Sequence, residues 1–318
     1  MREAGILITN HGSPLMMMKI AVLVPCYNEA QTIAQVVSDF KTHLPDAEIY
    51  VYDNNSKDNT AELAKKAGAI VRREPRQGKG YVVKRMFADV DADVYVMVDG
   101  DATYDASYAP QLITHLADHH LDMVNAARKT EETAAYRAGH RLGNRVLTSL
   151  VSWIFGEDFK DMLSGYRVFS RRFVKSFPVL SAGFEIETEL TVHALELKLS
   201  VDEIETPYYA RPEGSESKLS TYKDGWKILK MIFKLVKREK PLLFCNAFAL
   251  IFLILSLACG IPVIIDYLHS GLVLRLPTAI LAASLMSMAM LSVISGLILD
   301  TVTLGRREQK LLAYLNVR

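Results

Sequence analysis

Short apolar runs alternate with segments of helical spacing over the first hundred residues of the chain. The four apolar runs are rich in β-branched residues, as strands are, and cover 19–25, 48–52, 69–72 and 94–98. The three segments between them have the spacing of amphipathic helices and cover 29–43, 58–67 and 80–90. This alternation predicts an α/β domain whose mostly parallel sheet carries helices on both faces.

Two later stretches, 242–265 and 276–299, each run for 24 residues without a charge. At about 1.5 Å per residue, a helix of this length crosses a hydrocarbon core of about 30 Å. A pair of buried core helices is the alternative, but core helices seldom lack a polar face over such a length. We therefore expect two membrane spans.

Basic residues flank the two spans at one end only. Those before the first span and after the second are Lys234, Lys237, Arg238, Lys240, Arg306, Arg307 and Lys310, while the loop 266–275 has one charge of each sign. The positive-inside rule then places both chain termini in the cytoplasm and the hairpin loop outside. The expected location is the inner (plasma) membrane, with two spans and the large N-terminal domain in the cytoplasm.

The segment 219–240 has an apolar side that includes Trp226 and Phe233 and a lysine side that includes Lys227 and Lys234. This pattern is typical of an amphipathic helix at the membrane interface, with its lysines toward anionic head groups. A solvated basic helix packed on the N-terminal domain is the alternative.

Composition agrees with a membrane protein that has a large globular part. The chain is 50% hydrophobic and 23% charged, with a mean hydropathy of +0.13, which excludes a disordered chain. Residues 1–217 have more acidic than basic residues, which argues against nucleic-acid binding. Three scattered cysteines give no disulfide framework, and residues 1–18 lack the layout of a signal peptide, so we expect a disordered leader there.

Polar residues follow three of the expected strands, at the edge where ligands bind in parallel α/β sheets. They form the segments 25–29 (PCYNE), 53–56 (DNNS) and 99–101 (DGD). Asp99 and Asp101 together could bind a divalent cation that also holds a diphosphate, although an ordinary turn is the alternative for such a short motif. Gly78-Lys79-Gly80 predicts either a phosphate cradle or a simple helix start.

Taken together, these motifs resemble family-2 glycosyltransferases of the GT-A fold. The segments 161–167 (DMLSGYR) and 211–219 (RPEGSESKL) narrow the resemblance to polyprenyl-phosphate glycosyltransferases, the bactoprenol glucosyl transferases and dolichyl-phosphate mannose synthases. It implies the following organisation: a leader at 1–18, a Rossmann-like GT-A catalytic domain at 19–218, an amphipathic juxtamembrane helix at 219–240, a two-helix transmembrane hairpin at 241–300 and a cytoplasmic tail at 301–318.

The resemblance also implies a reaction and its residues. A nucleotide-sugar would donate its sugar, with inversion, to the phosphate of a membrane polyprenol in cell-envelope glycosylation. The nucleotide-binding residues would be Pro25, Tyr27, Glu29, Asp53, Lys79, Asp99 and Gly100. Asp99 and Asp101 would hold Mg²⁺ or Mn²⁺, and Asp161 matches the residue proposed as catalytic base. Two positions depart from the family pattern, because Asn54 replaces a frequent acidic residue and Thr103 a frequent glutamine.

The acceptor phosphate needs cations rather than a strong base, since its second pKa is about 6. Candidates are Arg137, Arg141 and Arg145, which recur every four residues on one helix face, together with Arg211 and Lys218. The alternative for the three arginines is a solvated face paired with nearby glutamates. For Asp161 the alternative is a turn cap. Glu185, Glu187 and Glu189 alternate and could line one face of a strand, but we expect them in the first turns of a helix, where acidic residues are favoured by the helix dipole.

Three functions compete on the sequence alone: sugar transfer to a lipid phosphate, processive polysaccharide synthesis and non-catalytic nucleotide binding. The first is favoured, with UDP-glucose as the expected donor and UDP-GlcNAc and GDP-mannose as alternatives. A processive polysaccharide synthase is disfavoured because the chain has no QxxRW motif. A non-catalytic nucleotide-binding scaffold is disfavoured by the presence of Asp99, Asp101 and Asp161. The resemblance also implies a homo-oligomer, for which a tetramer is one candidate.

Overall fold

A computed structural model describes residues 18–129, 149, 151, 153, 159–183, 185–211, 230, 233–234 and 236–317. Contacts between Cα atoms divide the chain into two units, residues 1–221 with 312–318, and residues 222–311. The expected leader, apart from Met18, and most of the expected interfacial helix at 219–240 lie outside the described residues.

The first unit contains a seven-stranded sheet. Its strands are β1 (Ile20–Cys26), β2 (Glu48–Asp53), β3 (Ile70–Arg73), β4 (Val94–Met97), β5 (Met123–Lys129), β6 (Arg167–Ser170) and β7 (Val201–Pro207). Their order across the sheet is β3-β2-β1-β4-β6-β5-β7. Only β6 runs antiparallel to its neighbours, β4 and β5. The expected α/β fold with a mostly parallel sheet is therefore confirmed.

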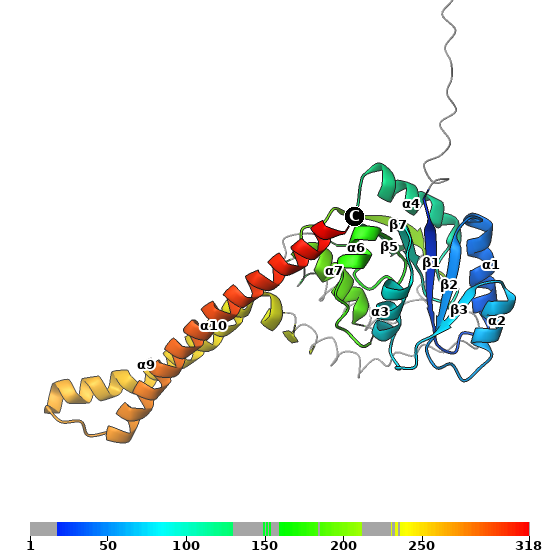
Figure 1. The fold of residues 1–318 in the computed structure, drawn as a ribbon. Coiled ribbons are helices and arrows are strands. Elements are labelled where there is room, and N and C mark those ends of the chain that lie inside the picture. The colour runs from blue at the N-terminus through cyan, green and yellow to red at the C-terminus, as the bar shows by residue number, and fades with distance from the viewer. Residues whose placement is uncertain are drawn as a thin grey trace, which may run out of the picture. The chain divides into compact units, whose positions relative to one another are not determined.

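Helices cover both faces of this sheet. They are α1 (Ile33–His43), α2 (Thr60–Lys66), α3 (Lys79–Asp89), the 3₁₀ turn η2 (Ala106–Tyr108), α4 (Ala109–Asp118), α6 (Arg171–Ser176) and α7 (Ile186–Glu196). Helix α1 contacts α2, α4 and η2 on one face, while α3 contacts α6 and α7 on the other (Figure 1). The helix expected at 29–43 begins at Ile33, because Glu29 and Thr32 form a turn in which the Glu29 carbonyl accepts from Thr32 N–H at 3.1 Å.

Alternate residues of the central strands face opposite layers, as the two-residue period of a strand requires. Val22 and Val24 of β1 join the core beneath α1, together with Ile33 and Phe40. The opposite layer is aromatic, with Phe87 of α3 packed against Tyr95, Phe169 and Phe177. Strands β1 and β4 are buried on both faces and contain no charged side chain, so the charged residues next to them follow the strands.

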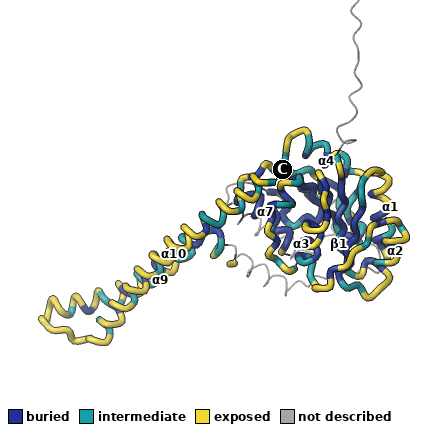
Figure 2. Tube along the Cα trace, in the orientation of Figure 1, coloured by how far each residue is buried: buried dark blue, intermediate teal, exposed yellow. Residues whose placement is uncertain are grey.

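The second unit is built around a helical hairpin, α9 (Pro241–Ser270) and α10 (Leu276–Asn316). Both helices are long and apolar enough to cross a membrane. Little of either apolar stretch is buried, and Figure 2 shows exposed residues along most of both helices. A soluble core helix would instead bury most of its length, so these helices have the surface expected of lipid-facing spans.

Small residues spaced seven apart form the contact between the two helices. The buried positions with this spacing are Ala249, Ser256 and Val263 in α9 and Ala282, Ala289, Gly296 and Thr303 in α10. A Cβ atom on Gly296 would lie 2.9 Å from the Cβ of Cys245, and the Ser256 hydroxyl donates to the Ala282 carbonyl at 2.8 Å. This is how helices pack in lipid, where close backbone approach replaces the hydrophobic effect.

Helix α10 continues well past the span expected at 276–299. Its 41 residues correspond to about 60 Å, roughly twice the thickness of a hydrocarbon core. The region expected as a tail at 301–318 is therefore helical as far as Asn316. The last turns carry Arg306, Arg307 and Lys310, so the apolar part of the helix is followed by a basic part.

Candidate active site

The candidate site lies at the carboxyl ends of β1, β2 and β4. Cys26 at the end of β1 pairs with Asp53 at the end of β2, and β1 also pairs in parallel with β4, after which Asp99 follows. The PCYNE, DNNS and DGD segments therefore meet at one edge of the sheet, as expected from the sequence. Parallel strands bring these ends together because their chain directions agree.

The turns after β1 and β2 are joined by hydrogen bonds. Asn28 N–H donates to Ser56 Oγ at 2.9 Å, and Lys57 N–H donates to Asn28 Oδ1 at 2.8 Å. Glu29 N–H donates to Thr60 Oγ1 at 2.9 Å. These bonds hold the two turns together. They therefore fix the position of the expected nucleotide-binding residues Pro25, Tyr27 and Glu29.

Asp53 and Asn54 are both buried at the end of β2. Asp53 Oδ1 accepts from Ser56 N–H at 3.2 Å. The Asn54 side-chain amide donates to the carbonyls of Glu74 at 3.0 Å and Arg76 at 2.7 Å, while its Oδ1 accepts from Gly78 N–H at 2.7 Å. A carboxylate could not donate the first two bonds. The departure from the family pattern at position 54 thus has a structural role, which is to hold the loop before α3.

That loop leads to Lys79, the first residue of α3. Gly78 immediately before it has φ +138°, a conformation that favours glycine. The Lys79 ammonium lies 2.5 Å from Asp99 Oδ1 and 2.5 Å from Glu187 Oε1. Burial alone would lower the pKa of Lys79, but the carboxylates of Asp99 and Glu187 raise it above its ordinary value. Gly78-Lys79-Gly80 forms the start of α3 and places a charged lysine beside the DGD motif, while the phosphate cradle stays a prediction.

Asp101 is buried and uses both carboxylate oxygens. Oδ1 accepts from Thr103 Oγ1 at 2.7 Å, and Oδ2 lies 2.6 Å from the Arg211 guanidinium. Burial and the neighbouring Asp99 raise the pKa of Asp101, against the opposing effects of Arg211 and Thr103. Thr103, the second departure from the family pattern, thus orients the carboxylate from within its own loop.

Glycines give the DGD loop room on two sides. A Cβ on Gly165 would lie 2.1 Å from Asp99 Oδ2, and one on Gly100 would lie 2.6 Å from Cys26 Sγ. The Gly100 carbonyl accepts from Thr32 Oγ1 at 2.6 Å, and Gly165 N–H donates to the Tyr104 hydroxyl at 2.8 Å. The segment 161–167 is therefore in direct contact with the DGD motif, although about sixty residues separate them in sequence.

Asp161 forms a bidentate ion pair with Arg128. Asp161 Oδ2 lies 2.6 Å from Arg128 Nε, and Oδ1 lies 2.9 Å from Nη2. Burial alone would raise the pKa of Asp161, but the Arg128 guanidinium outweighs this effect and lowers it. Asp161 is therefore held ionised at neutral pH and is a weak base. It also accepts from Leu163 N–H at 3.2 Å, so the turn cap considered as its alternative is present as well.

Arg167 connects this segment to the core. Its side chain is fully buried and donates to the carbonyls of Ser164 at 3.0 Å and Met162 at 2.6 Å, and to Thr191 Oγ1 at 2.8 Å. Burial lowers the pKa of Arg167. These bonds set the path of the chain from Asp161 to Gly165.

The donor set fits a divalent cation bound together with a diphosphate. Mg²⁺ is usually held through one or two carboxylates plus substrate phosphates rather than by a cage of protein ligands. Asp99 and Asp101 supply two carboxylates, and within the described ranges no group of three or more His, Cys, Asp or Glu side chains is arranged to hold a metal ion. The remaining ligands would come from the substrate and from water.

The structure brings together most of the residues expected from the sequence, but not all can be placed. Arg137, Arg141, Arg145 and Lys218 lie outside the described residues. Sequence reasoning assigned no role to Arg128, Tyr104 or Gly165, and did not foresee that Glu187 reaches Lys79. Glu187 does lie in the first turn of α7, as expected. The alternating acidic residues 185, 187 and 189 were the one feature of the sequence that could have indicated this contact.

A protein-family model for glycosyl transferase family 2 matches residues 21–177, which contain all four aspartates of the site. Glycosyltransferase AglJ of Haloferax volcanii is 35% identical over 226 residues, which are 71% of this chain and 74% of AglJ. The chain belongs to glycosyltransferase family 2. This glycosyltransferase is also 28% identical to a dolichyl-phosphate hexose transferase of Haloferax volcanii over 221 residues, 70% of the chain and 95% of that relative.

A solved structure has the same fold as the catalytic unit. Glucosyl-3-phosphoglycerate synthase from Mycobacterium tuberculosis, in complex with Mn²⁺, UDP-glucose and phosphoglyceric acid, aligns with a TM-score of 0.57 at 21% identity. The alignment covers 70% of this glycosyltransferase and 80% of the synthase chain. The expectation of a GT-A fold is thus confirmed. Membership of glycosyltransferase family 2 confirms the expectation of a sugar-transferring enzyme.

Proposed function

We propose that this glycosyltransferase transfers a hexose from a nucleotide-sugar to the phosphate of a membrane polyprenol. The observation that carries the proposal is the joining of a family-2 catalytic unit to a hairpin of two apolar helices. The dolichyl-phosphate hexose transferase that matches 70% of the chain supports an acceptor of this class. An acceptor embedded in a membrane explains why a transferase would carry lipid-facing helices.

For the donor we propose UDP-glucose, with UDP-GlcNAc and GDP-mannose as alternatives. Pro25, Tyr27, Glu29 and Asp53 would contact the base and ribose at the edge formed by β1 and β2. Asp99 and Asp101 would hold Mg²⁺ or Mn²⁺ beside the diphosphate, with Gly100 between them. The cation would stabilise the negative charge that develops on the leaving diphosphate. Lys79 would position the Asp99 carboxylate, because Glu187 holds the Lys79 ammonium from the other side.

The proposed transfer is a single displacement with inversion. An oxygen of the lipid phosphate forms the new bond to the anomeric carbon, while the bond to the diphosphate breaks and the nucleotide leaves with the electron pair. The phosphate is largely ionised near neutral pH, so no strong base is required. This agrees with the lowered pKa of Asp161. In place of the catalytic base implied by the resemblance, we therefore propose that Asp161 is a positioning residue, which holds the Arg128 guanidinium beside the reacting groups.

Basic side chains would bind the acceptor phosphate. Of the five candidates, Arg211 is within the described residues, and its guanidinium contacts the Asp101 carboxylate. Arg137, Arg141, Arg145 and Lys218 are proposed on the sequence alone. The proposed setting is the cytoplasmic face of the inner membrane, with both termini cytoplasmic and the chain in a homo-oligomer.

A transfer assay with purified protein in detergent tests this function. It uses undecaprenyl phosphate, Mn²⁺ or Mg²⁺ and a panel of labelled nucleotide-sugars, with Asp101→Ala as the control variant. Label should enter the lipid phase from one donor, and Asp101→Ala should lower the rate by at least about 100-fold. If no donor gives transfer while UDP still binds, the proposal is wrong and a non-catalytic nucleotide-binding scaffold is favoured.

A further inference from the structure

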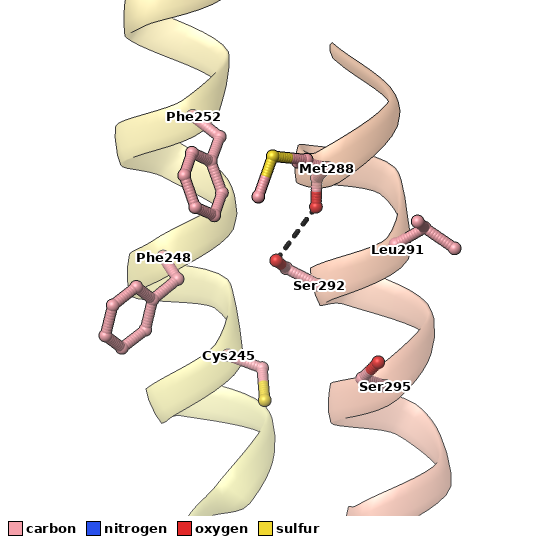
Figure 3. A pocket seen from close by; sticks show the side chains of 7 residues that line it. All are labelled: Cys245, Phe248, Phe252, Met288, Leu291, Ser292 and Ser295. Carbon is pink, nitrogen blue, oxygen red and sulfur yellow. Dashed lines mark hydrogen bonds between the residues drawn. The ribbon is translucent and has the colours of Figure 1, made fainter. Parts of the chain in front are cut away.

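A groove of about 300 Å³ runs along one side of the hairpin formed by α9 and α10. Helix α9 contributes Cys245, Phe248 and Phe252, and Met288, Ser292 and Ser295 lie across from them on α10. Figure 3 shows Phe252 and the Met288 thioether pointing toward one another across the gap. The Ser292 hydroxyl is bonded to the Met288 carbonyl at 2.9 Å, so it offers the groove little polarity. The volume is at the lower end of the range for small-molecule sites.

The wall of the groove on α10 continues as a stripe toward the basic end of the helix. Met288 and Arg306 are separated by 18 residues, about five turns of 3.6 residues, and therefore share one helix face. Between Ser295 and Arg306 the same face presents the exposed apolar side chains of Leu299 and Val302. The distance along the helix from Ser295 to Arg306 is about 16 Å. An apolar path thus joins the groove to a cationic side chain.

Three arginines surround one buried carboxylate at that end of the hairpin. Glu239 is buried, and its carboxylate lies 3.2 Å from Arg306, 3.5 Å from Arg307 and 3.4 Å from Arg238. Three guanidinium groups thus share this one carboxylate. In addition, Arg306 Nε is buried and has no hydrogen-bond acceptor among the described residues. A buried donor without an acceptor is costly, and a phosphate oxygen would satisfy it.

We propose that the hairpin is a binding site for the acceptor lipid, with the isoprenoid chain in the groove and the phosphate at the arginines around Glu239. The inference rests on the proposed function for the identity of the lipid. The stripe sets the orientation, because it leads from the groove to Arg306 and its neighbours. Methyl-branched, unsaturated isoprene units offer broad contact to the rings of Phe248 and Phe252 and to the polarisable sulfur of Met288. The site would keep the acceptor bound to the enzyme before transfer.

Direct binding is the first test, with the full chain in detergent and native mass spectrometry as the readout. The probes are undecaprenyl phosphate and phosphatidic acid, which both carry a phosphate monoester but on different chains. Wild-type protein should bind undecaprenyl phosphate, and an equal concentration of phosphatidic acid should not displace it. If phosphatidic acid binds equally well, the groove is an ordinary lipid contact and the proposal is wrong.

Three variants locate the site. Ser292→Phe fills the groove and Arg306→Gln removes the charge, so each should weaken undecaprenyl phosphate binding by about tenfold or more. Ala283→Phe is the matched control, because Ala283 is exposed and lies nine residues, about two and a half turns, before Ser292 on the opposite face. Unchanged binding in Ser292→Phe, or an equal loss in Ala283→Phe, would overturn the proposal.

A second readout separates this inference from the proposed function. The ratio of kcat/KM for undecaprenyl phosphate to that for a two-isoprene phosphate should fall about tenfold in Ser292→Phe and stay constant in Ala283→Phe. An unchanged ratio in an active enzyme rejects the groove alone. Absence of transfer to both acceptors in the wild type rejects the proposed function, and the binding measurements then decide the groove independently.

Discussion

The Arg211 guanidinium lies 2.6 Å from Asp101 Oδ2, on the carboxylate oxygen that Thr103 does not use. The other aspartate of the motif, Asp99, is paired in the same way with Lys79. Each carboxylate proposed to bind the metal is thus already in contact with a cation of the chain itself. Binding of a metal ion to Asp101 through Oδ2 requires that Arg211 move away.

This competition predicts that Arg211→Gln binds Mn²⁺ more tightly than the wild type in the absence of nucleotide. The expected gain is roughly threefold to tenfold, the range for a partly exposed ion pair that no longer has to be broken. Calorimetry or electron paramagnetic resonance of Mn²⁺ gives the affinity without any activity measurement. Lys129→Gln, which removes an exposed partner of Glu205, is the control and should have no effect. Equal or weaker Mn²⁺ binding in Arg211→Gln would contradict the competition.

Asn54→Asp should destabilise the protein by about 2 kcal/mol. The substituted carboxylate would face the carbonyls of Glu74 and Arg76, to which the asparagine now donates. The thermal unfolding midpoint measures the loss. Asn55→Asp is a useful comparison, because Asn55 donates one bond, to the Pro75 carbonyl, from a more exposed position and should cost less. Equal midpoints for wild type and Asn54→Asp would show that the amide is not needed.

Gly165→Ala should lower kcat by about 100-fold while leaving the fold intact. The added methyl group would lie 2.1 Å from Asp99 Oδ2, so the carboxylate must move from its present position. Steady-state transfer kinetics measure the effect, with circular dichroism to check the fold. Gly305→Ala is the matched control, since a Cβ there meets nothing within 4 Å, and helical propensity predicts a slight stabilisation. Full activity in Gly165→Ala would show that the contact with Asp99 is not required.

The Asp161–Arg128 pair predicts a specific loss of stability in acid. A carboxyl group with a lowered pKa in the folded protein stabilises it above the unfolded pKa, near 3.9, and loses that contribution as pH falls through the folded value. Asp161→Asn should therefore show a smaller fall in unfolding midpoint between pH 6 and pH 3 than the wild type. The variant should be less stable than the wild type at pH 6, because Arg128 loses its partner. Parallel pH profiles would assign the acid sensitivity to other carboxyl groups.

The sequence predicted the first four strands, the helices between them and the start of each span to within a few residues, because each depends on local periodicity. It also placed Asp53, Asp99 and Asp101 at one edge, since parallel strands share an end. It could not predict that Gly165 contacts Asp99 or that Arg128 pairs with Asp161, because these contacts depend on how β6 inserts antiparallel between β4 and β5. The reach of Glu187 to Lys79 likewise depends on the packing of α7 against α3, which no local pattern encodes.

The ion pairs at the DGD motif have a consequence for the order in which substrates bind. Lys79 and Arg211 carry two positive charges, whereas Asp99, Asp101 and Glu187 carry three negative ones, so the group has a formal charge of −1. A nucleotide diphosphate that arrives alone is repelled by this surplus, while one that arrives as its Mg²⁺ or Mn²⁺ complex brings the compensating charge with it. The enzyme should consequently discriminate, at the encounter step, between the metal complex of its donor and the bare anion.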